Sequence, residues 1–226
     1  EYRRQRQMCI RDRYYLDNLL NDNMILGISW GNTMYHTVKA VKTSKNIPIT
    51  VVPIMGAANV RTPERDSLDL SKELAYAYGG TYHYIYAPLF VNSEEVRDSL
   101  EQEPNIKGCL ELARNADIIL TSVGSIVYKS WKSYLSTRDL YNLEKKGAIG
   151  HIGGHFYDME GNEVITPFVN KMIGLGIEDI KNTENVICVA GLEMKAEAIL
   201  GAVRGGYINT LITDEEAAKA VLALCK

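Results

Sequence analysis

The residues best placed to do chemistry near the start of the chain are Ser29, Gly31, Asn32 and Thr33. They lie between a short apolar run at 24–28 and a segment whose apolar residues have helical spacing. A helix that begins here presents unpaired backbone N–H groups and the positive end of its dipole, and both attract anions such as phosphate. An ordinary helix cap would explain the same residue types, so both interpretations stay open at this point.

Lys195 is a second candidate because it falls in the first turn of an expected helix. A strand-like run ends at Ala190, Gly191 makes a turn, and the helical spacing follows. A cation at this end opposes the helix dipole, and a bound anion would offset the mismatch. Glu193 or Glu197 could offset it as well. A solvated lysine on the surface is the simpler alternative.

Four further residues lie where open parallel sheets bind ligands, beyond the carboxyl ends of strands. Gly124 and Ser125 are expected in the loop after one strand, and Gly56 in the loop after another. Each loop taken alone could be an ordinary turn between a strand and a helix. Asp158 could accept hydrogen bonds from sugar hydroxyls, or it could form the turn at 159–162.

The sequence carries no signature of a metal site or of catalysis. No nucleophile elbow, P-loop or dinucleotide-binding glycine pattern is present. Neither the cysteines nor the histidines have metal-binding spacing; they are Cys9, Cys109, Cys188, Cys225, His36, His83, His151 and His155. We therefore expect no metal, no cofactor and no catalytic residue.

Strand-like and helix-like segments alternate along the chain. The expected strands are 24–28, 49–54, 81–84, 117–121, 186–190 and 208–212. The expected helices lie near 12–21, 32–44, 64–78, 93–101, 104–115, 136–146, 193–204 and 214–225. The glycine-rich stretch 147–167 is expected to form a hairpin-like insertion. This alternation predicts an α/β fold, a mostly parallel sheet with helices on both faces.

Composition limits the classes of function. The 226 residues carry a net charge of −3, and residues 1–13 hold five arginines against one Glu and one Asp. The remainder therefore carries a net charge of about −6, which is a poor surface for nucleic acid. We expect residues 1–13 to be disordered or foreign to the fold, and 14–226 to form one domain. Without an apolar stretch of membrane-spanning length or an apolar signal region, the expected location is the cytoplasm, with no membrane partner.

Four stretches together resemble the C-terminal effector-binding domain of the SorC-type family of bacterial sugar-responsive transcriptional regulators. They are ILGISWGNTM, the long segment from YAPLFVNSEEV to ADIILTSVGSI, GAIGHIGGHFYDMEGNEV and KAEAILGAVRGGYINTLITDEEAA. The resemblance covers residues 14–226. It implies a fold similar to ribose-5-phosphate isomerase and glucosamine-6-phosphate deaminase.

The resemblance also implies a ligand site. Its phosphate-binding residues would be Ser29, Gly31, Asn32, Thr33 and Lys195, and its sugar-binding residues Gly56, Gly124, Ser125 and Asp158. The implied ligand is a phosphorylated sugar that alters operator binding by a helix-turn-helix domain not visible in this chain. A homodimer or homotetramer is expected.

The chain departs from the family pattern at several positions. Pro53 and Ala57 stand where the family often has Gln and Gly, and His151 and His155 stand where Asp and Arg are frequent. These departures bear on the identity of the sugar. Two alternatives stay open: a sugar-phosphate isomerase or deaminase on the same fold, and a fragment that retains only an oligomerisation role.

Overall fold

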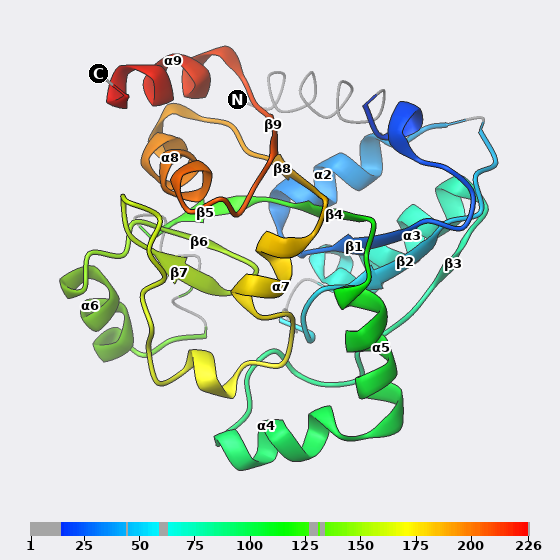
Figure 1. Ribbon diagram of the computed structural model, residues 1–226, viewed down its shortest axis with the longest axis horizontal. Coiled ribbons are helices and arrows are strands. Elements are labelled where there is room, and N and C mark those ends of the chain that lie inside the picture. Colours follow the sequence, from blue (N-terminus) through cyan, green and yellow to red (C-terminus); the bar gives the residue numbers. More distant parts are fainter. Residues whose placement is uncertain (1–14, 44, 59–62, 127–130, 132–133, 226) are drawn as a thin grey trace.

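The protein is described by a computed structural model that covers residues 15–43, 45–58, 63–126, 131 and 134–225 (Figure 1). Its main sheet has six strands, all paired in parallel, in the order β3-β2-β1-β4-β8-β9. The strands are β1 Ile25–Ile28, β2 Thr50–Pro53, β3 Thr81–Tyr82, β4 Ile118–Thr121, β8 Asn185–Val189 and β9 Thr210–Ile212. All six strands predicted from the sequence are confirmed, and so is the mostly parallel sheet.

The period of two along each strand divides the core into two layers. Leu26, Ile118 and Leu120 belong to one buried cluster, and Ile119 belongs to the other. Helices α2 (Asn32–Ala40) and α3 (Ser67–Tyr78) pack on the first face, together with a short helical segment at 15–19. The second face is covered by α5 (Pro104–Arg114), α7 (Ile177–Asn182) and α8 (Ala196–Arg204). Helices therefore lie on both faces, as predicted.

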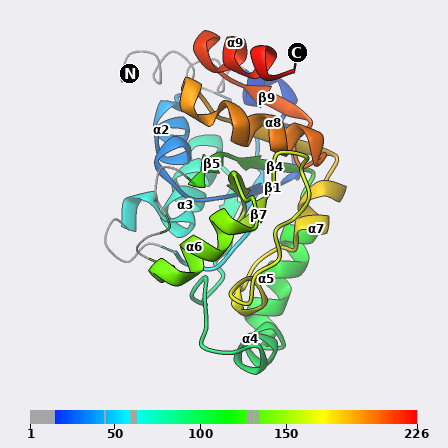
Figure 2. The same cartoon turned by 90° about the vertical axis from the view of Figure 1, so that its left-hand side faces the viewer.

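The remaining helices lie at the periphery. Helix α9 (Glu215–Leu224) packs on α8 at one end of the molecule, and α4 (Glu94–Glu101) lies at the opposite end (Figures 1 and 2). Helix α6 is Thr137–Lys145, and the 3-10 helices η1, η4 and η5 are Pro63–Arg65, Val169–Lys171 and Glu193–Lys195. Helix α7 was not predicted, and α2 ends at Ala40 rather than at residue 44.

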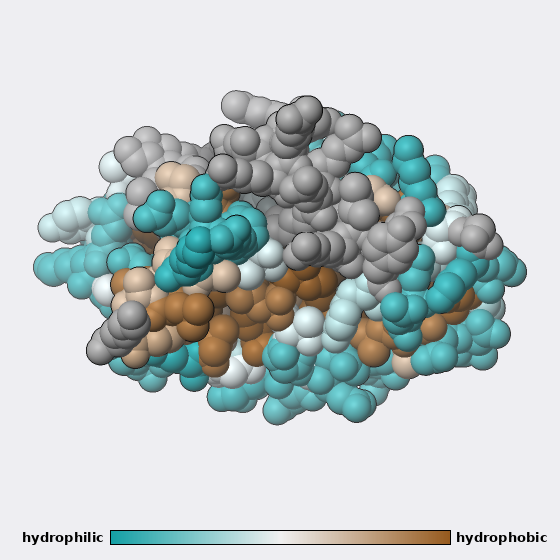
Figure 3. All heavy atoms as spheres, turned by 90° about the horizontal axis from the view of Figure 1, so that it is seen from above, coloured by the Kyte–Doolittle hydropathy of each residue, from teal (hydrophilic) through white to brown (hydrophobic). Residues whose placement is uncertain are grey.

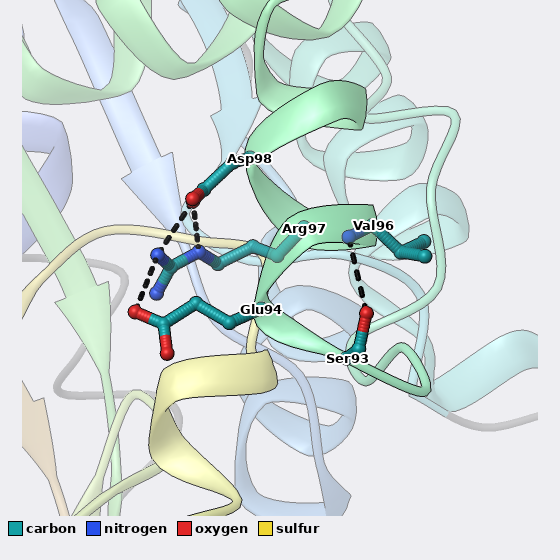
Figure 4. Close-up of polar contacts among 5 residues, drawn as sticks. All are labelled: Ser93, Glu94, Val96, Arg97 and Asp98. Carbon is teal, nitrogen blue, oxygen red and sulfur yellow. Dashed lines mark hydrogen bonds and ion pairs between the residues drawn. The ribbon is translucent and has the colours of Figure 1, made fainter.

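Side chains cap several of the described helices. Helix α6 begins with a capping box formed by Ser136 and Asp139. Helix α9 is capped by Asp214. At α4 the hydroxyl of Ser93 accepts a hydrogen bond from the N–H of Val96 (Figure 4). On the same helix, Arg97 forms ion pairs with the exposed carboxylates of Glu94 and Asp98. Exposed ion pairs of this kind contribute little to stability.

A second, antiparallel sheet departs from the predicted pattern. It consists of β5 (Val123–Ser125), β6 (Gly150–Ile152) and β7 (His155–Tyr157), in that order. The expected hairpin therefore exists, but it turns at Gly153 and Gly154, both of which have positive φ. The predicted turn at 159–162 follows β7 and leads only to a single bridge between Tyr157 and Glu163.

One outer face of the molecule is unusually apolar. Seen from the side that carries α9, apolar residues form a band between hydrophilic ones (Figure 3). Leu222 and Leu224 of α9 are 66% and 39% exposed. No helix in the part of the chain that the structure describes is long and apolar enough to cross a membrane.

Candidate functional site

The strand order of the main sheet marks one edge as a place for a ligand. The chain starts in the middle with β1, moves outward to β2 and β3, and then returns to β4 on the other side of β1. At such a reversal the connections leave in opposite directions and open a crevice beyond the carboxyl ends of the two strands. Ser29 follows β1, and Thr121 ends β4. The Thr121 hydroxyl donates to the Ser29 hydroxyl oxygen at 3.0 Å, across this reversal.

Helix α2 begins at this crevice with an open N-terminus. Its N-cap residue is Gly31, with φ of 123°, no side chain caps the helix, and its first turn holds no acid. A Cβ placed on Gly31 would meet no atom of the described residues within 4 Å. The ordinary cap formed by Ser29, Asn32 or Thr33 is thus not what the structure has. The first-turn N–H groups therefore have no side-chain cap, which is the arrangement that attracts an anion.

Arg65 adds a positive charge to this helix end, and sequence reasoning missed it. Its Nη1 donates to Oδ1 of Asn32 at 2.5 Å, and its backbone oxygen accepts from the N–H of Gly31 at 3.1 Å. The guanidinium also lies over the ring of Tyr35, 5.7 Å from the centroid. Burial lowers the pKa of His36, and the charge of Arg65 lowers it further. Arg65 lies in η1, far along the chain from the loop, so no local pattern could have indicated it.

Lys195 is drawn into the structure rather than extended into solvent. Its half-buried ammonium donates to the carbonyl oxygen of Val123 at 3.0 Å. Burial lowers the pKa of Lys195, since the charged form is harder to keep away from water. The interpretation as a solvated surface lysine was therefore wrong. Because Val123 lies two residues after Thr121, this bond places the Lys195 ammonium near the carboxyl end of β4.

The segment that carries Lys195 is held in a strained conformation. Leu192 has φ of 80°, which is unusual for a residue with a side chain. Its N–H donates to one carboxylate oxygen of Asp214 at 2.8 Å, while the other oxygen of Asp214 caps α9. One carboxylate therefore ties the lysine segment to the start of α9.

His151 belongs to β6 of the small sheet and is close enough to Lys195, in η5, to feel its charge. Burial, together with the charge of Lys195, lowers the pKa of His151 to about 3, so the imidazole is neutral near pH 7. Gly124 is its cross-strand partner, and a Cβ on Gly124 would collide with the imidazole ring. The glycine at 124 therefore makes room for His151, which is a different role from the predicted turn.

An aromatic cluster connects His151 to the loop at residues 29–33, called the anion loop below. Its rings stack edge to face at centroid distances of 5.1 to 6.0 Å. Trp30, which directly precedes Gly31, contacts Trp131, and Trp131 contacts His151. The members of this cluster are Trp30, Phe90, Trp131, Tyr134, His151, Phe156 and Phe168. Apolar rings thus lie between the anion loop and the small sheet.

The other predicted sugar-binding residues have structural roles. Gly124 and Ser125 lie in β5 rather than in a loop, so that part of the prediction was wrong. Gly56 is buried, donates its N–H to Ile173, and leaves no room for a Cβ beside the backbone of Pro88.

The carboxylate of Asp158 holds the turn at 159–162. It accepts from the N–H of Glu160 at 3.0 Å and from the N–H and side-chain amide of Asn162 at 2.8 and 3.1 Å. The turn-forming alternative therefore describes this residue in the structure, and a contact with a sugar hydroxyl stays a prediction. Within the described ranges, no group of three or more His, Cys, Asp or Glu side chains could hold a metal ion.

The chain is similar to one protein family and to several known regulators. A family model named Sugar-bind, described as "Putative sugar-binding domain", matches residues 2–223. The chain is 28% identical over 214 residues to the uncharacterized transcriptional regulator YjhU of Escherichia coli K12, covering 92% of the chain and 64% of that protein. It is also 28% identical over 210 residues to the deoxyribonucleoside regulator of Bacillus subtilis, covering 92% of the chain and 67% of the relative. The chain thus spans about two thirds of these relatives.

A solved structure shows the same fold. The full-length sorbitol operon regulator SorC of Klebsiella pneumoniae superposes with a TM-score of 0.91 at 24% identity, over 97% of this chain and 72% of that one. At this identity the likeness concerns the fold alone. The arrangement of the strands described above is therefore one that this solved structure shares.

Proposed function

The chain belongs to the Sugar-bind family of sugar-binding domains of transcriptional regulators, and from this premise we propose that its ligand is a phosphorylated sugar. The observation that carries the proposal is the uncapped N-terminus of α2 at the strand-order reversal. Among the described helices, α3, α4, α6 and α9 begin with a side-chain cap. Helices α5 and α8 have none, and α2 likewise begins at Gly31 without one. An anion bound there would satisfy the free N–H groups and interact favourably with the helix dipole.

Two cations support a phosphate over a neutral ligand. Arg65 is hydrogen-bonded to Asn32 in the first turn of α2. Lys195 is hydrogen-bonded to the carbonyl oxygen of Val123, just after the end of β4. Holding the Lys195 ammonium half-buried costs free energy, as its lowered pKa indicates. A bound phosphate would offset this cost by accepting a charge-assisted hydrogen bond. Ser29 and Thr33 would add hydroxyl donors, as predicted.

The proposed role of this binding is regulation rather than catalysis. The relatives YjhU and the deoxyribonucleoside regulator are regulators by name, and Lys195, Arg65 and a neutral His151 do not form an acid–base pair suited to isomerisation. We propose that the phosphosugar changes operator binding by a separate helix-turn-helix domain, in the cytoplasm. The acidic chain itself is not expected to bind operator DNA.

Self-association is part of the same proposal. A homodimer or homotetramer would cover the apolar band around α9, where Leu222 is 66% exposed. Light scattering on the wild-type chain and on Leu222→Lys tests this. A monomer for both proteins would contradict the proposed assembly without touching the ligand site.

Calorimetry on matched ligand pairs tests the phosphate requirement. The pairs are ribose with ribose 5-phosphate, glucose with glucose 6-phosphate and fructose with fructose 6-phosphate, and inorganic phosphate is the reference ligand. The phosphorylated member of a bound pair should bind at least tenfold tighter, and at one hundred times its dissociation constant it should stabilise the protein by about 2.7 kcal/mol. Equal affinity for a sugar and its phosphate would contradict the proposal. Turnover of ribose 5-phosphate or glucosamine 6-phosphate would favour the enzyme alternative instead.

A further inference from the structure

Two hydroxyl side chains meet where the main sheet reverses its strand order. The register that pairs Ile28 of β1 with Leu120 of β4 brings Ser29 beside Thr121. The backbone of Ser29 is fixed there, because its N–H donates to the carbonyl oxygen of Leu120 at 3.2 Å. Ser29 keeps a small exposed fraction of 4%, whereas Thr121 is 0% exposed. Thr121 therefore offers no surface to a ligand and can act on one only through Ser29.

The hydrogen bond between the two side chains uses the proton of Thr121 and leaves the proton of Ser29 free. Oγ1 of Thr121 donates to Oγ of Ser29 at 3.0 Å. The other acceptor near Thr121 is the carbonyl oxygen of Ser122 at 3.5 Å, which is longer than an ordinary O–H···O bond. Within the described ranges, the Ser29 hydroxyl donates to no other group. A hydroxyl has one proton and two lone pairs, so Ser29 can accept from Thr121 and still donate to a ligand.

The direction of this hydrogen bond decides what Ser29 offers to a ligand. In the reverse direction Ser29 would donate to Thr121, and Thr121 would donate to the distant carbonyl of Ser122. The Ser29 oxygen would then present only lone pairs. A sugar phosphate near neutral pH also presents mainly acceptor oxygens, so the two would repel each other. The observed direction instead leaves Ser29 a donor, which is the partner that a phosphate oxygen requires.

We propose that Thr121 is a positioning residue for phosphate binding, whose buried hydroxyl orients Ser29 so that the Ser29 proton is presented to the anion. The inference rests on the proposed function, because it assumes that a phosphate group binds beside Ser29. The same turn also holds the charged donor, since the carbonyl oxygen of Val123, two residues further on, accepts from Lys195 at 3.0 Å. The turn after β4 thus orients one neutral and one cationic donor of the proposed site.

Calorimetry on Thr121→Val tests the proposal, because valine keeps the shape of threonine and removes its hydroxyl. The probes are ribose 5-phosphate, glucose 6-phosphate and fructose 6-phosphate, and the one that wild-type protein binds most tightly is carried through the variants. Thr121→Val should weaken this ligand about fivefold. Thr121→Ser restores the hydroxyl and should bind within about twofold of the wild type. Thr183→Val is the matched control and should bind as the wild type does, because Thr183 is also buried but its hydroxyl donates to the carbonyl of Asp179.

A double-mutant cycle separates positioning from a general structural role. Ser29→Ala should weaken the same ligand about tenfold, and adding Thr121→Val to it should weaken binding no further, because no hydroxyl is left to orient. Thr121→Ala removes the same hydroxyl and gives a second, independent measurement of the coupling.

A merely structural role for Thr121 would lower the affinity by the same factor with and without the Ser29 hydroxyl. That result would overturn the inference, and so would wild-type affinity in both Thr121→Val and Thr121→Ala, while the phosphate site itself would stand. If none of the three sugar phosphates bound wild-type protein, the proposed function would fail, and this inference with it.

Discussion

The N-termini of α2 and α3 lie close together, and only one of them is satisfied by the chain. Asp66 caps α3 by accepting from the N–H of Leu68 at 3.2 Å, and it also accepts from Ala58 at 2.9 Å. Helix α2 starts at Gly31 with no side-chain cap. The two helices pack on the same face of the same sheet, so packing does not explain the difference.

The two histidines of the small sheet repeat the contrast. His155 uses both ring nitrogens, whereas Nε2 of His151 is buried and unpaired. Groups whose hydrogen bonds are completed inside the chain contribute to stability, and groups left open cost stability until a ligand arrives. The contrast therefore separates residues whose polar groups are satisfied inside the chain from residues whose polar groups are not.

Lowering the pH should produce the largest difference in stability between the wild type and a variant that lacks the unpaired His151. The pKa of His151 is about 3 in the folded protein, and it is about 6.5 in an unfolded chain. Between these values the unfolded chain binds the extra proton, so stability is lost as the pH falls below 6.5. His151→Phe lacks this term and should lose less stability than the wild type between pH 7 and pH 4, by on the order of 3 kcal/mol. Chemical denaturation at both pH values measures this, and parallel losses in the two proteins would contradict it.

Removing the satisfied histidine should cost more at neutral pH than removing the open one. His155→Phe leaves the carboxylate of Glu163 and the carbonyl of Leu175 without their hydrogen-bond partner. This loss should lower the free energy of unfolding by about 2–3 kcal/mol. His151→Phe leaves no hydrogen-bond partner of Nε2 unpaired among the described residues, so it should change the free energy of unfolding by less than about 1 kcal/mol. Urea unfolding at pH 7.5 compares them. A larger loss in His151→Phe would reverse the assignment of the two residues.

Lys195→Met should change binding more than stability. The substitution removes an ammonium that is costly to bury, so apo stability should stay the same or rise slightly. Phosphosugar affinity should fall tenfold or more, which corresponds to at least about 1.4 kcal/mol. Lys219→Met, which removes an exposed ammonium on α9, is the control and should leave affinity unchanged. If the two variants bound the best available phosphosugar equally well, Lys195 would lie outside the site.

Asn32→Asp should shift stability and binding in opposite directions by small amounts. A carboxylate in the first turn of α2 interacts favourably with the helix dipole and should raise stability by roughly 0.5 kcal/mol. The same charge repels phosphate, so affinity should decrease. Asp69→Asn removes the acid from the first turn of α3 and should lower stability by a few tenths of a kcal/mol with no effect on binding. Thermal unfolding with and without inorganic phosphate resolves both effects.

Local patterns in the sequence were sufficient for the main sheet and most helices. Strand β1 was predicted because its apolar run ends sharply at Ser29, and the helix expected near 136–146 is α6. The short strand β5 was missed, since Val123–Ser125 is a strand only through its pairing with β6. Helix α7 was missed for a related reason: six residues are too few to show a helical period.

The same distinction applies to the site. Ser29, Gly31, Asn32 and Thr33 were predicted together because one turn of chain contains them all. Arg65 and Trp131 reach the site only through tertiary packing. Asp158 could be assigned from the sequence to either of two roles, and only the contacts with Glu160 and Asn162 distinguish them.

The bond between Thr121 and Ser29 has a consequence for the order of folding events. It joins residues 92 positions apart, and the bond from Lys195 to Val123 joins residues 72 apart. Both contacts close long loops, which are entropically slow to form. A partly folded chain with only its first three strands assembled would lack the β4 and Lys195 sides of the crevice. The ability to bind the proposed ligand should therefore be among the last properties to return during refolding.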